Sequence, residues 1–305
     1  RGQPYRDAGI GLIGGTQEFS TGGLGYTSLR GRMTELIQGQ VVYLLRRLVR
    51  LLRIGHRYDL VVVVGDVIPV MAAWLCRRPV VTYLVAYSSH YEGRLRLPWP
   101  CASCLSSRRF RAIFSRDQCT ADDLSDQLTR EVRFLGNPFM DPVLADAGRL
   151  PATRQRLGLL PGSRRPELEQ NLRLLLQMIE RLPTELFGEG VLELDLALVA
   201  SLDDPSLHDL VQPWGWDLAE ASDGSGMLLQ RGPRHIHVRR GTFAAVLHSS
   251  DLLVCMAGTA AEQAVGLARP VLQLAGRGPQ FTAGFAEAQR RLLGPTVFCA
   301  QGEPG

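Results

Sequence analysis

The sequence contains no lysine, and all 34 of its basic residues are arginine. Three classes of site depend on a lysine amine: the Walker A loop, the strand-three lysine of protein kinases and the Schiff base of pyridoxal-phosphate enzymes. The sequence therefore excludes all three. If the protein binds phosphate, it must use arginine, backbone N–H groups and the N-termini of helices.

Long apolar runs and strong net charge are also lacking. The sequence has no uninterrupted run of about 18 apolar residues, so we expect no transmembrane helix. No signal peptide is recognisable. The net charge is only +4, and no aromatic residues interleave with a long basic tract, which argues against nucleic-acid binding. Such a balance suits an anionic substrate or an anionic membrane surface equally well.

Cysteine and histidine are sparse, with six residues of each. Cys101 and Cys104 form a C-x-x-C pair without a second pair at zinc-ribbon spacing, so we interpret the pair as incidental. The remaining cysteines lie in apolar runs, and a reducing cytoplasm fits this usage best. His235 and His237 share one face of a predicted strand, but no third ligand accompanies them. A metal site is therefore not predicted.

Strands alternate with helices along most of the chain. Residues 58–65 (YDLVVVVG) are short, β-branched and apolar, which predicts a buried parallel strand. Further strands are predicted at 79–86, 111–115, 132–135, 156–160, 192–200, 236–238, 252–256 and 271–274. Helices are predicted at 167–181, behind Thr120 as an N-cap, and from residue 258. Residues 141–153 contain two prolines and a glycine and predict a linker. The pattern predicts an α/β protein with two Rossmann-like domains, 1–145 and 146–305, facing across a cleft.

Residues 28–54 predict one long helix, because apolar residues recur at steps of three and four. Four arginines share the opposite face: Arg46, Arg47, Arg50 and Arg53. Two interpretations stay open. One is an ordinary solvated face, and the other is docking of this face on anionic lipid.

The strongest candidate site follows the predicted strand at 156–160. Gly162 permits a tight turn before a helix, and ligands of open α/β sheets bind at the carboxyl ends of strands. The helix N-terminus attracts anions. Ser163 adds a hydroxyl, and Arg164 can bind phosphate with two parallel hydrogen bonds. The sequence predicts a phosphate-binding turn here, with a helix cap beside a surface arginine as the alternative.

A second candidate site follows the strand at 252–256. Gly258 permits close approach of a ligand to the backbone, and Thr259 is predicted to cap the helix. Glu262 lies about one turn later, where its carboxylate can accept hydrogen bonds from a ribose diol. The alternative is a favourable charge near a helix N-terminus. Gln280 and Gln289 follow the last predicted strand, and their amides are weaker candidates for binding sugar hydroxyls.

Together these motifs resemble the lipid-A-disaccharide synthase family. LLPGSRRPELEQN (159–171) is similar to the family's LLPGSR-x-x-E signature, and MAGTAAEQAVGLARPVL (256–272) to its S-G-T-x-x-x-E segment. GNPFMD (136–141) is similar to its domain-junction turn. GGTQEF (14–19) and the segment 278–289 resemble the group found in cyanobacteria and plastid lineages. The resemblance covers nearly the whole chain and is strongest in its C-terminal half.

The resemblance implies a GT-B fold and metal-independent, inverting transfer of an acylated glucosamine. The donor would be linked to UDP, and the acceptor would be the 6-hydroxyl of an acylated glucosamine 1-phosphate. Ser163 and Arg164 would bind the diphosphate, and Gly258, Thr259 and Glu262 the nucleotide. Asp66 would be the general base, with capping of the next helix as its alternative role. The location implied is cytoplasmic, at the inner face of the inner membrane.

The chain departs from the family in two places. The family's D-x-P-D-F segment reads GDVIP at 65–69, and its usual first strand and glycine-rich acceptor loop would have to precede Arg1. Three alternatives therefore stay open. They are a GlcNAc transferase acting on another lipid acceptor, an enzyme similar to UDP-GlcNAc 2-epimerase, and a nucleotide-sugar-binding relative without catalysis.

Overall fold

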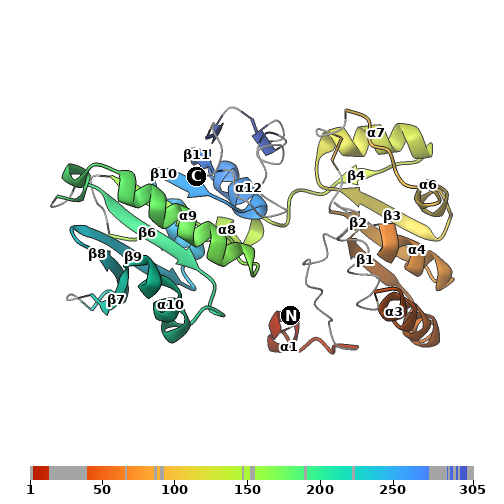
Figure 1. The fold of residues 1–305 in the computed structure, drawn as a ribbon. Helices are drawn as coiled ribbons and strands as arrows, with labels where there is room; N and C mark the ends of the chain where they lie inside the picture. Colours follow the sequence, from red (N-terminus) through yellow and green to blue (C-terminus); the bar gives the residue numbers. More distant parts are fainter. Residues whose placement is uncertain are drawn as a thin grey trace. The chain divides into compact units, whose positions relative to one another are not determined.

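A computed structural model divides the chain into two compact units, Arg1–Leu135 and Gly136–Gly305 (Figure 1). The structure describes residues 3–13, 40–65, 67–85, 88–89, 93–145, 148–151, 155–188, 191–221, 224–274, 287, 289–290, 293–294 and 296–300. The division falls earlier than the boundary predicted at 145/146. The predicted linker begins with a short helix, α8 (Asp141–Leu144), which packs on helix α11 (Phe243–Ser249) of the second unit.

The first unit is built on a parallel sheet of four strands in the order β1-β2-β3-β4. Its elements are α1 (Gln3–Asp7), α3 (Gln40–Gly55), β1 (Val61–Gly65), α4 (Val67–Leu75), β2 (Val80–Leu84), α6 (Cys101–Leu105), β3 (Phe110–Ser115), α7 (Gln118–Leu128) and β4 (Arg133–Phe134). The predicted alternation of strands and helices is confirmed here. Part of the helix predicted at 28–54 is α3, and residues 28–39 lie outside the described residues.

Strand β1 is parallel as predicted, but the prediction that it is buried is wrong. Val63 is buried, whereas Val62 and Val64 are 64% and 69% exposed. Val62 and Val64 point to the same face of the strand, and that face is exposed to solvent. A run of valines has the same appearance in the sequence whether one or both faces of the strand are covered.

Helix α7 begins one turn before the predicted position. Its N-cap is Asp117, whose Oδ1 accepts a hydrogen bond from the backbone N–H of Thr120 at 2.7 Å. The prediction that Thr120 is the N-cap is therefore wrong. Asp117 has the extended backbone of an N-cap, and aspartate is among the strongest capping residues.

The second unit is built on an eight-stranded sheet in the order β12-β11-β10-β5-β6-β9-β8-β7. Its strands are β5 (Arg156–Leu160), β6 (Glu193–Leu198), β7 (Asp217–Glu220), β8 (Met227–Arg231), β9 (Arg234–Arg240), β10 (Leu252–Cys255), β11 (Val271–Gln273) and β12 (Val297–Cys299). Besides α8, its helices are α9 (Glu167–Arg181), α10 (Asp204–Val211), α11 (Phe243–Ser249), α12 (Gly258–Gly266) and the 3₁₀ turns η2 (Thr184–Phe187) and η3 (Gln212–Trp214). The strand predicted at 156–160 and the helix predicted at 167–181 are confirmed.

Helices cover both faces of this sheet. Leucines of α9 and α10 pack with β6 and β9 in one core, and α11 and α12 pack with β10 and β11 in another. From β5 the chain proceeds through α9 to β6 on one side, and from β10 it proceeds through α12 to β11 on the other. The strand order therefore reverses between β5 and β10. In open α/β sheets a ligand crevice forms at such a switch point, outside the carboxyl ends of the strands.

The antiparallel edge of this sheet was not predicted from the sequence. Strands β7 and β8 pair antiparallel, β8 and β9 form a hairpin, and β9 is longer than the strand predicted at 236–238. The hairpin turn holds Gly232 at a φ of +58°, a conformation that suits glycine. The fully buried Trp216 immediately before β7 joins this edge to the core of α9 and α10.

Candidate functional site

The turn after β5 has the tight geometry that the sequence predicted. Gly162 has a φ of +98°, and a Cβ atom at this position would lie 3.4 Å from the Cβ of Ala257 in the turn after β10. This backbone conformation favours glycine, and a larger side chain there would contact the turn after β10. Ser163 and Arg164 follow and are exposed. Among the described residues, the guanidinium of Arg164 has no hydrogen-bond or ion-pair partner, whereas that of the next residue, Arg165, pairs with Glu169 at 3.0 Å.

The turn after β10 leads into α12 with its first N–H groups uncapped. The N-cap residue is Ala257, which has no side chain able to accept a hydrogen bond. The first bond within the helix runs from the N–H of Ala261 to the carbonyl of Ala257, so the N–H groups of Gly258 and Thr259 precede the helical ladder. The predicted capping role of Thr259 is wrong, because Thr259 lies inside the first turn and is exposed.

One buried side chain joins the two turns. Asn171 on α9 is only 4% exposed. Its Nδ2 donates hydrogen bonds to the carbonyl of Pro161 at 2.9 Å and to the carbonyl of Met256 at 3.2 Å. The N–H of Met256 in turn donates to the carbonyl of Leu160 at 2.9 Å. The turns after β5 and β10 are therefore held together as one surface at the switch point.

Glu262 is half-buried on α12, one turn after Gly258. Its Oε1 accepts a hydrogen bond of 2.6 Å from Nδ2 of Asn137. A carboxylate is an acceptor only, so the group suits a donor such as a ligand hydroxyl. Asn137 is the second residue of the second unit, and the sequence pattern predicted a turn there without a functional role.

Two predicted site residues, Asp66 and Gln280, lie outside the described residues. Asp66 directly follows Gly65, the last residue of β1. Gln289 is described and is 5% exposed, and its Oε1 accepts a hydrogen bond from Nε2 of Gln273 at 2.6 Å. The weaker expectation for Gln289 therefore loses support, because this buried oxygen already has a partner.

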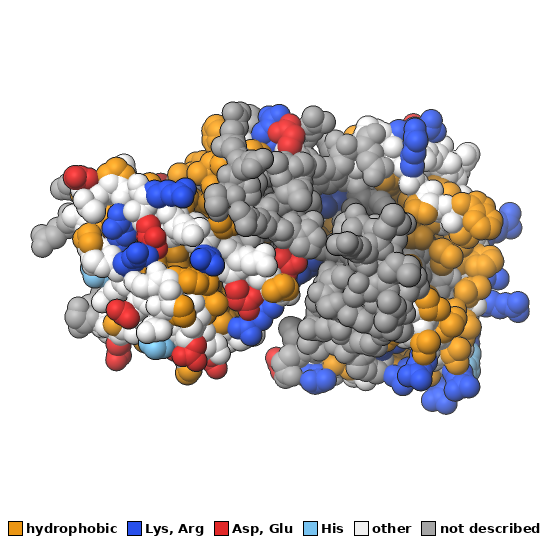
Figure 2. All heavy atoms as spheres, in the orientation of Figure 1, with side chains coloured by type: hydrophobic (Ala, Val, Ile, Leu, Met, Phe, Trp, Pro, Cys, Tyr) orange, Lys and Arg blue, Asp and Glu red, His pale blue; other side chains and the backbone are white. Residues whose placement is uncertain are grey.

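Helix α3 presents arginines beside exposed apolar side chains. Arg46, Arg50 and Arg53 are exposed, and so are Val42, Leu45, Val49 and Leu52. The lower right of Figure 2, where α3 lies, shows blue arginines next to orange hydrophobic side chains.

Arg47 does not share this environment. It lies over the ring of Tyr43 at 5.1 Å and donates to the Tyr43 hydroxyl and to the Ile13 carbonyl. Unlike the three exposed arginines, Arg47 is half-buried and has partners within the first unit.

Buried thiols in both units are held in their neutral form. Burial raises the pKa of Cys255, at the end of β10, to about 12, and burial together with the neighbouring Cys104 raises the pKa of Cys101 to about 11. A nucleophilic cysteine needs a lowered pKa, so neither thiol suits covalent catalysis at neutral pH. Cys101 and Cys104 are both buried in the core of the first unit, and all six cysteines are unbridged.

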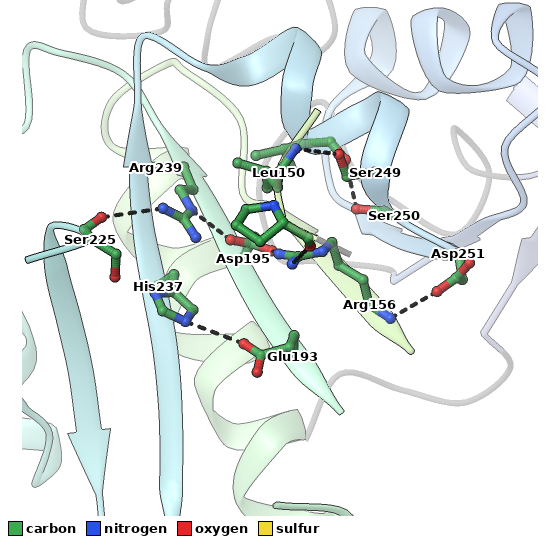
Figure 3. Close-up of polar contacts among 12 residues, drawn as sticks. Leu150, Arg156, Glu193, Asp195, Ser225, His237, Arg239, Ser249, Ser250 and Asp251 are labelled. Carbon is green, nitrogen blue, oxygen red and sulfur yellow. Dashed lines mark hydrogen bonds and ion pairs between the residues drawn. The ribbon is translucent and has the colours of Figure 1, made fainter. Parts of the chain in front are cut away.

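The described residues contain no group of three or more histidine, cysteine, aspartate or glutamate side chains that could hold a metal ion. His237 instead pairs with Glu193 at 3.2 Å (Figure 3). Likewise, within the described part of the chain no helix is long and apolar enough to cross a membrane.

Comparisons with known proteins rest on structure alone, since no protein-family profile and no curated protein sequence matches the chain. The spinosyn rhamnosyltransferase SpnG, solved with spinosyn aglycone, superposes with a TM-score of 0.50 at 14% identity. The match covers 97% of this chain and 75% of that protein. The chain has a GT-B fold.

Two further solved structures have similar but weaker matches. The S. aureus protein MnaA, solved with UDP, gives a TM-score of 0.49 at 14% identity and covers 83% of this chain and 72% of that one. UDP-GlcNAc 2-epimerase from Neisseria meningitidis gives a TM-score of 0.44 at 15% identity, and the match covers 82% of this chain. The chain spans only 66% of the length of the Neisseria enzyme, just under two thirds.

Proposed function

We propose that the second unit binds the nucleoside diphosphate of a UDP-sugar at the turns after β5 and β10, and that the chain is a UDP-sugar-handling enzyme. The observation that carries this proposal is the joined pair of turns at the switch point of the sheet. Gly162 lies against Ala257, and Asn171 bonds to both turns. This position is where open α/β sheets bind nucleotides.

The chemistry of the two turns suits a diphosphate. The N–H groups at the start of α12 carry a partial positive charge directed at the turn. Arg164 supplies a guanidinium that no described acid neutralises, and Ser163 supplies a hydroxyl. Glu262 would accept hydrogen bonds from the ribose diol, and Gln280 would contact the sugar. Because positive groups are supplied by the chain itself, we expect binding without a metal ion.

Two reactions on this donor are proposed. The first is 2-epimerisation of UDP-GlcNAc, the reaction named for the Neisseria enzyme. The second is transfer of the sugar to a lipid-linked acceptor, the reaction implied by the resemblance to lipid-A-disaccharide synthases, with Asp66 as general base. The arginines and apolar side chains that α3 exposes together favour the second, because this combination suits an anionic lipid surface.

Calorimetry with UDP tests the binding site. We expect the wild type to bind UDP in the presence of EDTA, and Arg164→Ala and Glu262→Ala each to weaken binding by about 1–3 kcal/mol, the range for a lost charge-assisted hydrogen bond. Arg165→Ala is the matched control, since its guanidinium already pairs with Glu169. It should change UDP binding little. Absence of UDP binding by the folded wild type would contradict the proposal.

Product analysis separates the two reactions. Incubation with UDP-GlcNAc alone would give its C2 epimer if the chain is an epimerase. A transferase would release UDP only with an acylated donor and an acylated glucosamine 1-phosphate acceptor presented in vesicles. Replacing Arg46 and Arg50 with alanine should lower transfer to a vesicle-bound acceptor but leave epimerisation unchanged, because a soluble substrate needs no lipid surface.

A further inference from the structure

The segment that follows the boundary between the two units lies along helix α12. Three contacts hold it there. Nδ2 of Asn137 donates to Glu262, and Nε2 of Gln263 donates to the carbonyl of Phe139 at 2.6 Å. Met140 packs so closely on Gly266 that a Cβ there would lie 2.4 Å from the Met140 methyl carbon. This segment, which we call the junction segment (137–140), is therefore seated on the same helix that begins the proposed nucleotide site.

The turn around Asn137 fixes the orientation of its amide. Oδ1 of Asn137 accepts a hydrogen bond from the N–H of Phe139 at 3.2 Å, as in a turn closed by an asparagine side chain. With its oxygen turned back to the main chain, the amide presents its NH₂ group to Glu262. The position needs an acceptor and a donor on one short side chain. Asparagine provides both, whereas aspartate cannot donate and alanine can do neither.

We propose that Asn137 is a positioning residue for nucleotide binding, which orients the Glu262 carboxylate toward the ribose hydroxyls. This proposal rests on the proposed function of Glu262. A glutamate has several rotatable bonds, and a donor at 2.6 Å restricts them before the ligand arrives. Asn137 is the second residue after the unit boundary, so the orientation of the ribose ligand depends on the seating of the junction segment.

The two polar contacts of the junction segment allow a matched comparison. Asn137→Ala removes the bond to Glu262 and the bond to Phe139 N–H. Gln263→Ala removes the other polar tie of the segment to α12 but leaves Glu262 and Asn137 in place. If Asn137 acted only by fastening the segment, both changes would have the same effect on nucleotide binding.

The experiment measures binding of UDP and of 2′-deoxy-UDP to the wild type and to both variants. We expect the wild type to prefer UDP, and Asn137→Ala to weaken UDP binding about tenfold while changing 2′-deoxy-UDP binding little, because the loss falls on the ribose hydroxyl. Gln263→Ala should keep the preference for UDP. Adding Asn137→Ala to Glu262→Ala should weaken UDP binding no further, since Asn137 acts on the nucleotide only through Glu262.

Several outcomes would overturn the proposal. Equal losses for UDP and 2′-deoxy-UDP in Asn137→Ala, or the same lost preference in Gln263→Ala, would reduce Asn137 to a structural tie. If Glu262→Ala loses the preference but Asn137→Ala keeps it, the ribose site stands and the positioning role fails. If the wild type binds neither nucleotide, the proposed function itself fails. Asn137→Asp, which keeps an acceptor for the N–H of Phe139 but cannot donate to Glu262, repeats the comparison should Asn137→Ala not fold.

Discussion

Gly162 lies in the turn after β5, where a side chain would meet the turn after β10. Gly162→Ala places a methyl group 3.4 Å from the Cβ of Ala257 on a backbone with a φ of +98°. We expect a loss of about 1–3 kcal/mol in the free energy of unfolding from backbone strain, together with weaker UDP binding because the turn must shift. Thermal unfolding and calorimetry measure these two effects.

Gly232→Ala is the matched control for this change. Gly232 also has positive φ, at +58°, but has no atom within 4 Å of its added Cβ. It lies in the β8–β9 turn at the amino end of β9, whereas the proposed site lies at the carboxyl ends of the parallel strands. Its alanine variant should lower the unfolding temperature but leave UDP binding unchanged. An equal loss of UDP affinity in both variants would mean that global destabilisation, not the turn, causes the effect.

Asp123 in the first unit gives the stability of the protein a pH dependence. Burial raises the pKa of Asp123, but hydrogen bonds from Ser89, the N–H of Leu95 and Gln127 outweigh it and hold this pKa below its ordinary value of 3.8. A group whose pKa is lowered by folding stabilises the native state above its unfolded pKa. That stabilisation is lost as the pH falls from about 4 through the folded pKa.

Asp123→Asn should lower the free energy of unfolding by about 1–3 kcal/mol at neutral pH, since a charged acceptor is replaced by an amide. The difference from wild type should shrink as the pH falls below 3.8. Urea unfolding at neutral and acid pH measures this difference, with Asp122→Asn, on an exposed neighbour, as the control. If the difference in unfolding free energy between wild type and Asp123→Asn stays constant or grows in acid, the ionised carboxylate of Asp123 is not its source.

At single positions, the sequence predicted residues whose role follows from a local motif. The tight turn at Gly162 was predicted because a strand, a turn and a helix follow one another within the chain, and its positive φ confirms it. The phosphate-binding roles of Ser163 and Arg164 stay predictions. Asn171 was missed, although a polar residue within the apolar stripe of α9 is a signal that its side chain has a buried partner. The bond between Asn137 and Glu262 joins residues far apart in sequence, and no local pattern reports such a contact.

Strands β5, β6 and β9 are tied together by a buried ion network. Asp195 on β6 is fully buried and accepts hydrogen bonds from Arg156 on β5 and, at 2.6 Å, from Nε of Arg239 on β9 (Figure 3). Arg156 also donates to the carbonyl of Pro151 at 2.7 Å, which fastens the incoming chain to the sheet. One carboxylate therefore pairs with two largely buried guanidinium groups.

Asp195→Ala should destabilise the second unit by about 3–5 kcal/mol, because it leaves buried arginine without its counter-ion. Asp204→Ala is the control, since Asp204 is 46% exposed and pairs with Arg240 near the surface. Asp204→Ala should lower the free energy of unfolding by no more than about 1 kcal/mol. Denaturant unfolding compares the two variants. Similar small losses in both would show that the network contributes little to stability.

Elements were predicted where their periodicity is strong. Helix α9 and strand β5 are apolar at regular steps and keep their predicted bounds. Strands β7 and β8 were missed because they are short and form an antiparallel edge in which most side chains are only partly buried. The segment of α8 was predicted to be a linker, because a short stretch that contains proline is typical of a loop. Its Val143 is nevertheless buried in the core of the second unit.

For the whole molecule, the alternation of strands and helices was enough to predict two α/β units. The strand order, which places the switch point between β5 and β10, could not be predicted, because it depends on long-range pairing. The proposed site follows from that order, since only the order brings the turn at Gly162 beside the turn at Ala257. All described residues assigned to the nucleotide belong to the second unit.

Hydrogen exchange on the wild-type chain, with and without UDP, tests this central claim most directly. We predict that UDP slows exchange in peptides covering 161–168 and 256–262, which contain both turns, while the β7–β8 hairpin at 217–231 in the same unit is unchanged. Protection of both turns together would support a diphosphate held at the switch point. Protection confined to other segments at saturating UDP, with both turns unchanged, would contradict the account.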